Sequence, residues 1–169
     1  MADFINTSLR IIKDGKVTSD TWRIVARSET TLPDGSMLVL PLTLWEKYQS
    51  DLAGRTDIGI WFDSDEQPTD EIATALRSLP LVAIQFPVFT DGRGFSIARL
   101  LRERFGYQGE LRAFGYVLRD QLCFLKRCGF NSFSLQEHAD VEAALASLDD
   151  FTEYYQTSVD QPQPLFRRA

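Results

Sequence analysis

The sequence predicts an α/β domain in which about five strand–helix units form a mainly parallel sheet with helices on its faces. From residue 37 onward, short apolar runs typical of buried strands alternate with segments whose apolar residues recur at helical spacing. Glycine and proline residues separate these segments. Such alternation favours parallel strands joined by right-handed helical crossovers. A half-barrel of the same units is the alternative arrangement.

The composition indicates a single globular domain. The chain has 169 residues, of which 44% are hydrophobic and 25% charged, as is ordinary for such a domain. A net charge of -6 argues against a basic nucleic-acid-binding face. No apolar run approaches the roughly 20 residues of a membrane span, and the first residues lack a secretory signal. We therefore expect a cytoplasmic protein with no nucleic-acid or membrane partner.

The single domain, residues 1–169, divides into three parts: an N-terminal β arm (1–30), a strand–helix core (37–156) and an extended C-terminal tail (157–169). Within the arm, Asp14-Gly15 lies between two apolar segments, which is a hairpin signal because type I′ turns need positive φ. We expect that this arm can complete the sheet of a second copy and so form a homodimer. Prolines keep the tail from being helical throughout.

The elements of the core follow from local patterns. Ser96 is placed to cap a helix, and Asp140 is placed to cap the last one. Pro80 and Gly129 each end a helix. The expected strands are 37–40, 58–62, 81–86, 111–117 and 132–135, and the expected helices are 43–52, 72–79, 97–105, 118–128 and 141–151.

Ligands of an open parallel sheet lie beyond the carboxyl ends of its strands, so the loops there are the candidate site. An arginine beside a helix N-terminus suits phosphate, sulfate, sulfite or a carboxylate. The alternative is an ordinary turn with an ordinary helix cap. The residues predicted to bind an anion are Asp91, Gly92, Arg93, Gly94, Ser96, Arg119 and Gln121.

Two further residues at this edge are weak catalytic candidates. Asp120 is a candidate acid, although its place at a helix start also suits a cap. His138 is the sole histidine and a candidate proton carrier, although a lone loop histidine is commonly only solvated. The dinucleotide fingerprint fails because Ile97 stands where its third glycine belongs. We expect no cofactor and, with one histidine, no metal site within the chain.

The tail ends in Phe166, Arg167 and Arg168, residue types that often anchor protein interfaces. On an extended tail they predict docking to an acidic partner. A frayed terminus is the alternative.

Several segments together resemble one known family. They are residues 89–104 (FTDGRGFSIARLLRER), 109–113 (GELRA), 118–122 (LRDQL) and 127–130 (RCGF). The family is a bacterial one of unknown function, and its members are labelled as oxidoreductases of sulfite reduction and often lie beside sulfite reductase genes. The resemblance implies a role in sulfur metabolism with sulfite reductase as a partner.

The resemblance is incomplete at three positions. The family usually has an acidic residue, a lysine and an aspartate where this chain has Gln85, Val88 and Tyr116. An anion-binding role therefore fits this chain better than a proton-transfer role. We expect an accessory protein of assimilatory sulfite reduction that binds a small oxyanion or the reductase. The alternatives are an oxidoreductase with a borrowed cofactor and a non-catalytic interaction module.

Overall fold

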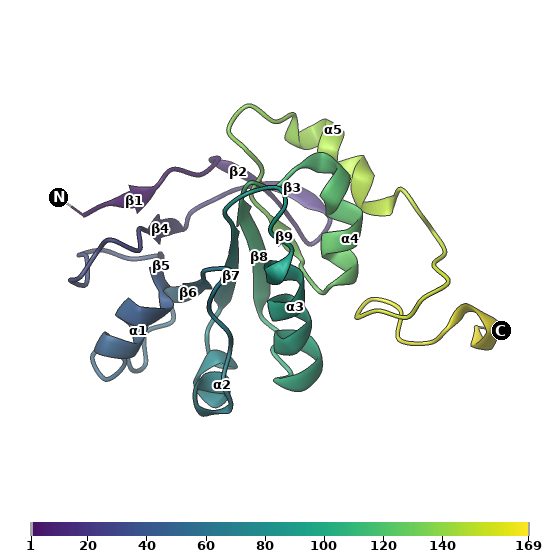
Figure 1. Ribbon diagram of the computed structural model, residues 1–169. Coiled ribbons are helices and arrows are strands. Elements are labelled where there is room, and N and C mark those ends of the chain that lie inside the picture. The colour runs from purple at the N-terminus through teal and green to yellow at the C-terminus, as the bar shows by residue number, and fades with distance from the viewer. Residues whose placement is uncertain (1, 169) are drawn as a thin grey trace.

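The computed structural model describes residues 2–168, so Met1 of the arm and Ala169 of the tail lie outside the description. Its strands join into one sheet in the order β1-β4-β5-β6-β7-β8-β9-β2-β3 (Figure 1). The strands are β1 (Phe4–Ile5), β2 (Arg10–Lys13), β3 (Lys16–Ser19), β4 (Arg23–Val25), β5 (Leu38–Pro41), β6 (Ile58–Phe62), β7 (Leu81–Phe86), β8 (Glu110–Gly115) and β9 (Ser132–Phe133).

Helical segments connect the central strands. The five α-helices are α1 (Leu42–Tyr48), α2 (Asp70–Leu76), α3 (Arg93–Arg99), α4 (Leu122–Arg127) and α5 (Val141–Leu145). Helix α3 continues into a π-helical turn at Leu100–Arg104, and 3-10 turns occur at Arg119–Gln121, Ala146–Asp149 and Leu165–Arg167.

The sheet is mixed, which corrects the expectation of a mainly parallel one. Strands β4 to β9 are parallel neighbours. Strand β1 pairs antiparallel with β4, and β2 pairs antiparallel with both β9 and β3. The difference arises because the N-terminal arm contributes antiparallel strands at both edges of the sheet of its own chain.

The helices cover one face of the sheet, not both as expected. Strands β5 to β9 lie side by side in chain order, so every right-handed crossover moves in the same direction and returns on the same side. The larger apolar cluster accordingly joins the helices to Leu40, Ile60 and Ile84. The opposite face carries a smaller cluster that includes Trp61 and Phe114. The sheet curls around this smaller cluster as a half-barrel (Figure 1), the alternative arrangement.

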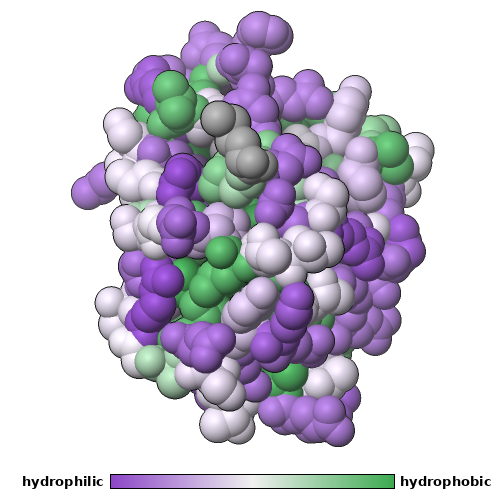
Figure 2. Space-filling model, turned by 90° about the vertical axis from the view of Figure 1, so that its left-hand side faces the viewer, coloured by the Kyte–Doolittle hydropathy of each residue, from purple (hydrophilic) through white to green (hydrophobic). Residues whose placement is uncertain are grey.

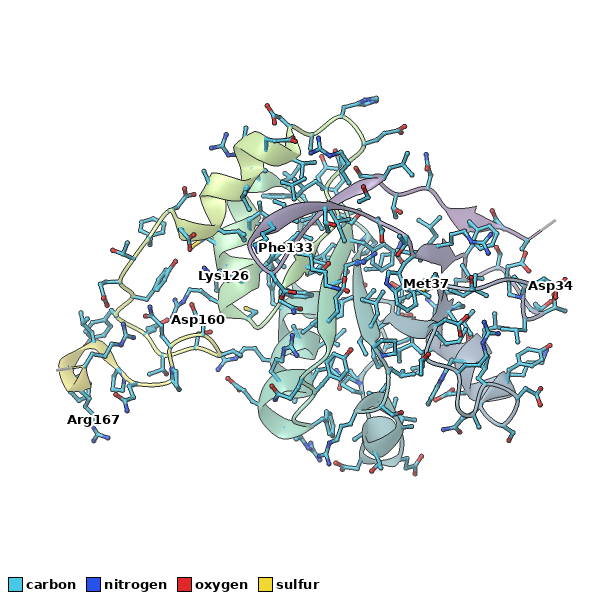
Figure 3. The ribbon with its side chains drawn as sticks, turned by 180° about the vertical axis from the view of Figure 1, so that it is seen from behind. Asp34, Met37, Lys126, Phe133, Asp160 and Arg167 are labelled. Carbon is cyan, nitrogen blue, oxygen red and sulfur yellow. The ribbon has the colours of Figure 1, made fainter. Side chains whose placement is uncertain are left out.

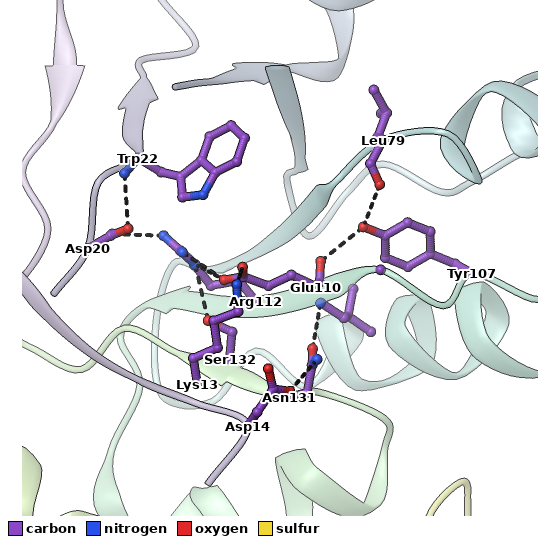
Figure 4. A network of polar contacts seen from close by, with 12 residues as sticks. Lys13, Asp14, Asp20, Trp22, Leu79, Tyr107, Glu110, Arg112, Asn131 and Ser132 are labelled. Carbon is purple, nitrogen blue, oxygen red and sulfur yellow. Dashed lines mark hydrogen bonds and ion pairs between the residues drawn. The ribbon is translucent and has the colours of Figure 1, made fainter. Parts of the chain in front are cut away.

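A buried ionic network ties the arm to the concave face (Figure 4). The Arg112 side chain is 1% exposed and pairs with Asp20 at 2.8 Å and with Glu110 at 2.7 Å. Lys13 pairs with the other Glu110 oxygen at 2.5 Å, and Arg112 also donates to the Ser132 hydroxyl. Burial alone raises the pKa of Glu110, but the charge of Arg112 and these hydrogen bonds outweigh it and leave the pKa lowered.

The chain after Asp149, which we call the C-terminal segment and which ends in the tail, leaves the body of the molecule and carries Arg167 to its far end (Figures 1 and 3). Arg127 of α4 holds its middle by donating to the carbonyl of Gln156. The ring of Tyr154 lies 3.9 Å from the Arg127 guanidinium, and its hydroxyl is 2.5 Å from the Cys123 sulfur.

The face that carries β1, β4 and α1 is mostly hydrophilic around a central apolar strip (Figure 2). Within residues 2–168, no helix has the length and apolar character needed to cross a membrane.

Candidate functional site

The carboxyl ends of β6, β7, β8 and β9 form one rim, because these strands are adjacent and parallel. Of the residues predicted for the site, Asp91, Gly92 and His138 lie in the loops that follow these strands. Arg93, Gly94 and Ser96 lie in the first turns of α3, and Arg119, Asp120 and Gln121 form the 3-10 turn after β8. The contacts divide these residues into two groups, one around Arg93 and one around Arg119.

Arg93 is held in a fixed position by its own loop and by the loop after β6. Its guanidinium makes two hydrogen bonds to the carboxylate of Asp91, at 2.9 and 2.6 Å, and a third to the Ser64 hydroxyl at 2.9 Å. The bonds from Arg93, together with the Ser64 hydroxyl, hold the pKa of Asp91 well below its usual range. Asp91 therefore already compensates the positive charge of Arg93, although the arginine side chain is 61% exposed.

The glycines of this loop set the start of α3, and the expected cap at Ser96 is wrong. The helix begins at Arg93, whose amide donates to the Asp91 carboxylate at 3.1 Å, so Ser96 lies exposed one turn inside. Gly92 is at the capping position. Gly94 allows α3 to approach β7 closely, because an added Cβ there would lie 2.7 Å from the ring of Phe86.

Arg119 has a different environment at the end of β8. Its Nε donates to the hydroxyl of Ser147 at 2.6 Å, and Ser147 is buried. Among residues 2–168, no carboxylate forms an ion pair with Arg119. The side chain of Gln121 folds back to accept from the amide of Leu118, and Asp120 is exposed on the same turn.

A cavity of about 380 Å³ connects Arg119 with His138. Asp140 also lines it, and its carboxylate caps α5 as expected by accepting from the amide of Ala143 at 2.9 Å. The structure therefore brings Arg119 and His138 to one space, whereas the loop around Arg93 contributes nothing to it. The lining residues are Val117, Leu118, Arg119, Gln136, His138, Ala139, Asp140, Ala143 and Ala144.

Exposed apolar side chains at the same rim were missed by the sequence reasoning. Phe89 and Phe124 are 52% and 53% exposed, and Val88 and Tyr116 are 53% and 41% exposed. The ring of Phe124 packs against that of Phe95 at a tilt of 59°, with a ring-centroid distance of 4.9 Å. We call Val88, Phe89, Tyr116 and Phe124 the rim patch. The aromatic residues beside the loop of Arg93 could have indicated this patch from the sequence, since exposed apolar groups often mark interaction sites.

The second cavity and the buried cysteine Cys128 lie outside this site. A larger cavity of about 600 Å³ lies away from the rim, between the Asp14-Gly15 turn and α5, and the ion pair of Lys126 with Asp149 borders it. Burial raises the pKa of the Cys128 thiol to about 11, so this buried cysteine is not a thiolate at neutral pH. In the described part of the chain, no three His, Cys, Asp or Glu residues are grouped so as to hold a metal ion.

Comparison with known proteins identifies the family. Residues 59–166, more than half of the chain, match the family described as "Bacterial protein of unknown function (DUF934)". The chain belongs to this family. The match contains all the rim loops described above and leaves out the N-terminal arm, and it confirms the predicted bacterial family of unknown function. Comparisons with curated proteins and with solved structures gave no match.

Proposed function

We propose that this DUF934 protein is an accessory protein of assimilatory sulfite reduction that binds a small oxyanion at the rim of its sheet. The observation that supports the proposal is Arg119, a guanidinium fixed by a buried serine and left without a carboxylate partner among residues 2–168. The link to sulfite reduction is supported by the resemblance of residues 89–104 and 118–122 to proteins labelled in that way.

The geometry of Arg119 suits this role. Its Nε is committed to Ser147, which orients the planar guanidinium and leaves the Nη groups for a ligand. Paired guanidinium N–H groups bind tetrahedral and planar oxyanions with two parallel hydrogen bonds. Arg93 is less suited, because the carboxylate of Asp91 already accepts hydrogen bonds from its Nε and from one of its Nη groups.

Titration calorimetry with sulfite, sulfate and phosphate tests the oxyanion site. We expect binding to the unaltered protein and at least a tenfold loss of affinity in Arg119→Gln, because the cationic guanidinium is removed. Arg99→Gln is the matched control, since Arg99 is exposed at the end of α3 and paired with Glu103 of the π-helical turn. The absence of heat with all three anions at millimolar concentration would overturn the oxyanion proposal.

Growth of a bacterium that encodes the protein tests the link to sulfite reduction. We expect that deletion of the gene slows growth on sulfate as the sole sulfur source, and that sulfide restores it. Equal growth of the deletion strain and its parent on sulfate would contradict this part of the proposal.

A second candidate function is docking to sulfite reductase, and the exposure of the rim patch favours it. Phe89 and Phe124 supply apolar area of the kind that anchors interfaces. We expect Phe89→Ser with Phe124→Ser to reduce co-purification of the reductase, whereas Leu9→Ser, at an 81% exposed leucine, leaves it unchanged. Equal recovery with both variants would discard the rim patch as the docking surface.

An oxidoreductase with a borrowed cofactor and a homodimer through the arm stay predictions.

The tail is a further candidate docking element, for an acidic partner. Phe166 is 76% exposed at the end of the tail, next to Arg167, whereas Arg168 turns back to pair with Glu153. If the tail docks to an acidic partner, deletion of residues 162–169 lowers recovery of that partner from a cell lysate. Unchanged recovery would discard the tail as a docking element.

A further inference from the structure

We infer that the cavity of Arg119 and His138 takes a small organic anion, an acidic head group on a short aliphatic chain, in preference to a bare inorganic oxyanion. This inference rests on the proposed function, because it uses the same arginine as the anchor for the negative charge. The aliphatic chain is the part of the ligand that Arg119 does not touch.

The size of the cavity is the first argument. Its volume of about 380 Å³ lies in the range of roughly 300–1,000 Å³ that is common for small-molecule sites. A five-atom oxyanion fills the space of only two to three waters, at about 30 Å³ each. Most of the cavity therefore remains for another part of the ligand.

The walls are the second argument. Beyond the polar groups, the lining is apolar: Ala139 and Ala143 are exposed, and Val117 and Ala144 belong to the core. Alanines at positions 139, 143 and 144 keep this wall short, which leaves the space open. An aliphatic chain that leaves water for such a wall gains about fourfold in affinity per methylene.

The distribution of charge is the third argument. Arg119 and the amide of Gln136 offer N–H donors to the cavity, and His138 offers another. Asp140 is the one carboxylate in the lining, and the amide of Ala143 already engages its Oδ1. The lining thus favours a negative head group beside Arg119 and an uncharged body beside the alanines.

Calorimetry with a graded series of anions tests the inference on the full-length protein. The series is sulfate, methanesulfonate, propanesulfonate, acetate and butyrate. We expect affinity to rise about fourfold for each added methylene within both the sulfonates and the carboxylates, and to fall at least tenfold for all of them in Arg119→Gln. The better of the two head groups identifies the class of acid.

The outcomes separate this inference from the proposed function. If sulfate binds as tightly as propanesulfonate, the oxyanion proposal stands and the organic anion is refuted. If no anion binds, or Arg119→Gln binds all of them as the unaltered protein does, both are refuted.

A variant that fills the cavity provides a second test. Ala143→Leu puts a larger apolar side chain into the space assigned to the aliphatic body, and Ala143 is exposed, so the fold accommodates the change. We expect it to reduce the ratio of propanesulfonate to sulfate affinity at least tenfold. Ala146→Leu is the matched control, because Ala146 is exposed nearby and lines the other cavity. An unchanged ratio in Ala143→Leu would refute the inference.

Discussion

At the scale of single residues, Arg112 shows how much depends on one buried charge. Its side chain is 1% exposed and lies between Asp20 and Glu110, whose side chains are 3% and 5% exposed. Removing the arginine alone leaves the buried carboxylate of Asp20 without a cation and Glu110 with Lys13 as its one remaining partner, which is far more costly than loss of an exposed pair.

We therefore expect Arg112→Ala to lower the free energy of unfolding by about 3–5 kcal/mol, as measured by urea denaturation. Arg104→Ala is the control, because Arg104 pairs with Asp70 where both side chains are more than half exposed. Its loss should cost no more than about 1 kcal/mol. Equal effects of the two substitutions would show that the concave network does not stabilise the fold.

The same network predicts a dependence of stability on pH. Burial raises the pKa of Glu110, but Arg112, Lys13 and Ser132 together lower it by more than burial raises it. The folded-state pKa therefore lies below the unfolded-state value. The resulting stabilisation is complete above the unfolded-state pKa and disappears as the pH falls through the folded-state pKa. Between pH 6 and pH 3, Glu110→Gln should lose less stability in urea than the unaltered protein. Parallel losses in the two proteins would contradict this assignment.

At the scale of elements, the contact of α3 with β7 depends on the absence of a side chain at position 94. A Cβ at Gly94 would lie 2.7 Å from the ring of Phe86, whereas at Gly92 it would meet only Phe95, at 3.7 Å. The two glycines therefore differ in what a methyl group would displace.

We expect Gly94→Ala to destabilise the protein by about 1–3 kcal/mol through overpacking, even though alanine favours helix. Gly92→Ala should change stability by less than half as much. Thermal unfolding of both variants checks this, and a lower melting temperature for Gly92→Ala than for Gly94→Ala would show that packing against Phe86 is not the limiting contact.

Other elements show what local patterns can predict. The expected strands 58–62 and 81–86 coincide with β6 and β7, because unbroken apolar runs are read without knowledge of their neighbours. The cap at Asp140 was also predictable, since its bond spans three residues. The start of α3 was not, because Ser96 suits a cap locally, whereas the hydrogen bond of Arg93 to Ser64, 29 residues earlier, exists only in the folded chain.

At the scale of the whole molecule, the curled sheet separates two regions of different composition. The rim carries the cavity and the exposed apolar side chains, whereas the concave face is filled by Trp61, Phe114 and the network of Arg112. The C-terminal segment after Asp149 lies outside both, and its aromatic residues Phe151 and Tyr155 are 66% and 77% exposed.

Limited proteolysis tests this division. We expect chymotrypsin to cleave first after Phe151 or Tyr155, because exposed chain with few contacts is cut before a packed core. Mass spectrometry of the early fragments identifies the site. First cleavage at the buried Phe62 or Phe114 would show that the core opens as readily as the tail.

The sequence by itself determined an α/β domain, the strands at 58–62 and 81–86 and the cap at Asp140, because spacing, turns and caps act over a few residues. Only the tertiary structure decided that Asp20 reaches Arg112 across 92 residues, that Ser147 orients Arg119, and that Arg119 shares its cavity with His138 while Arg93 does not. Those outcomes follow from the order of strands in the sheet and the single direction of its crossovers, which place distant segments side by side and which no local pattern encodes.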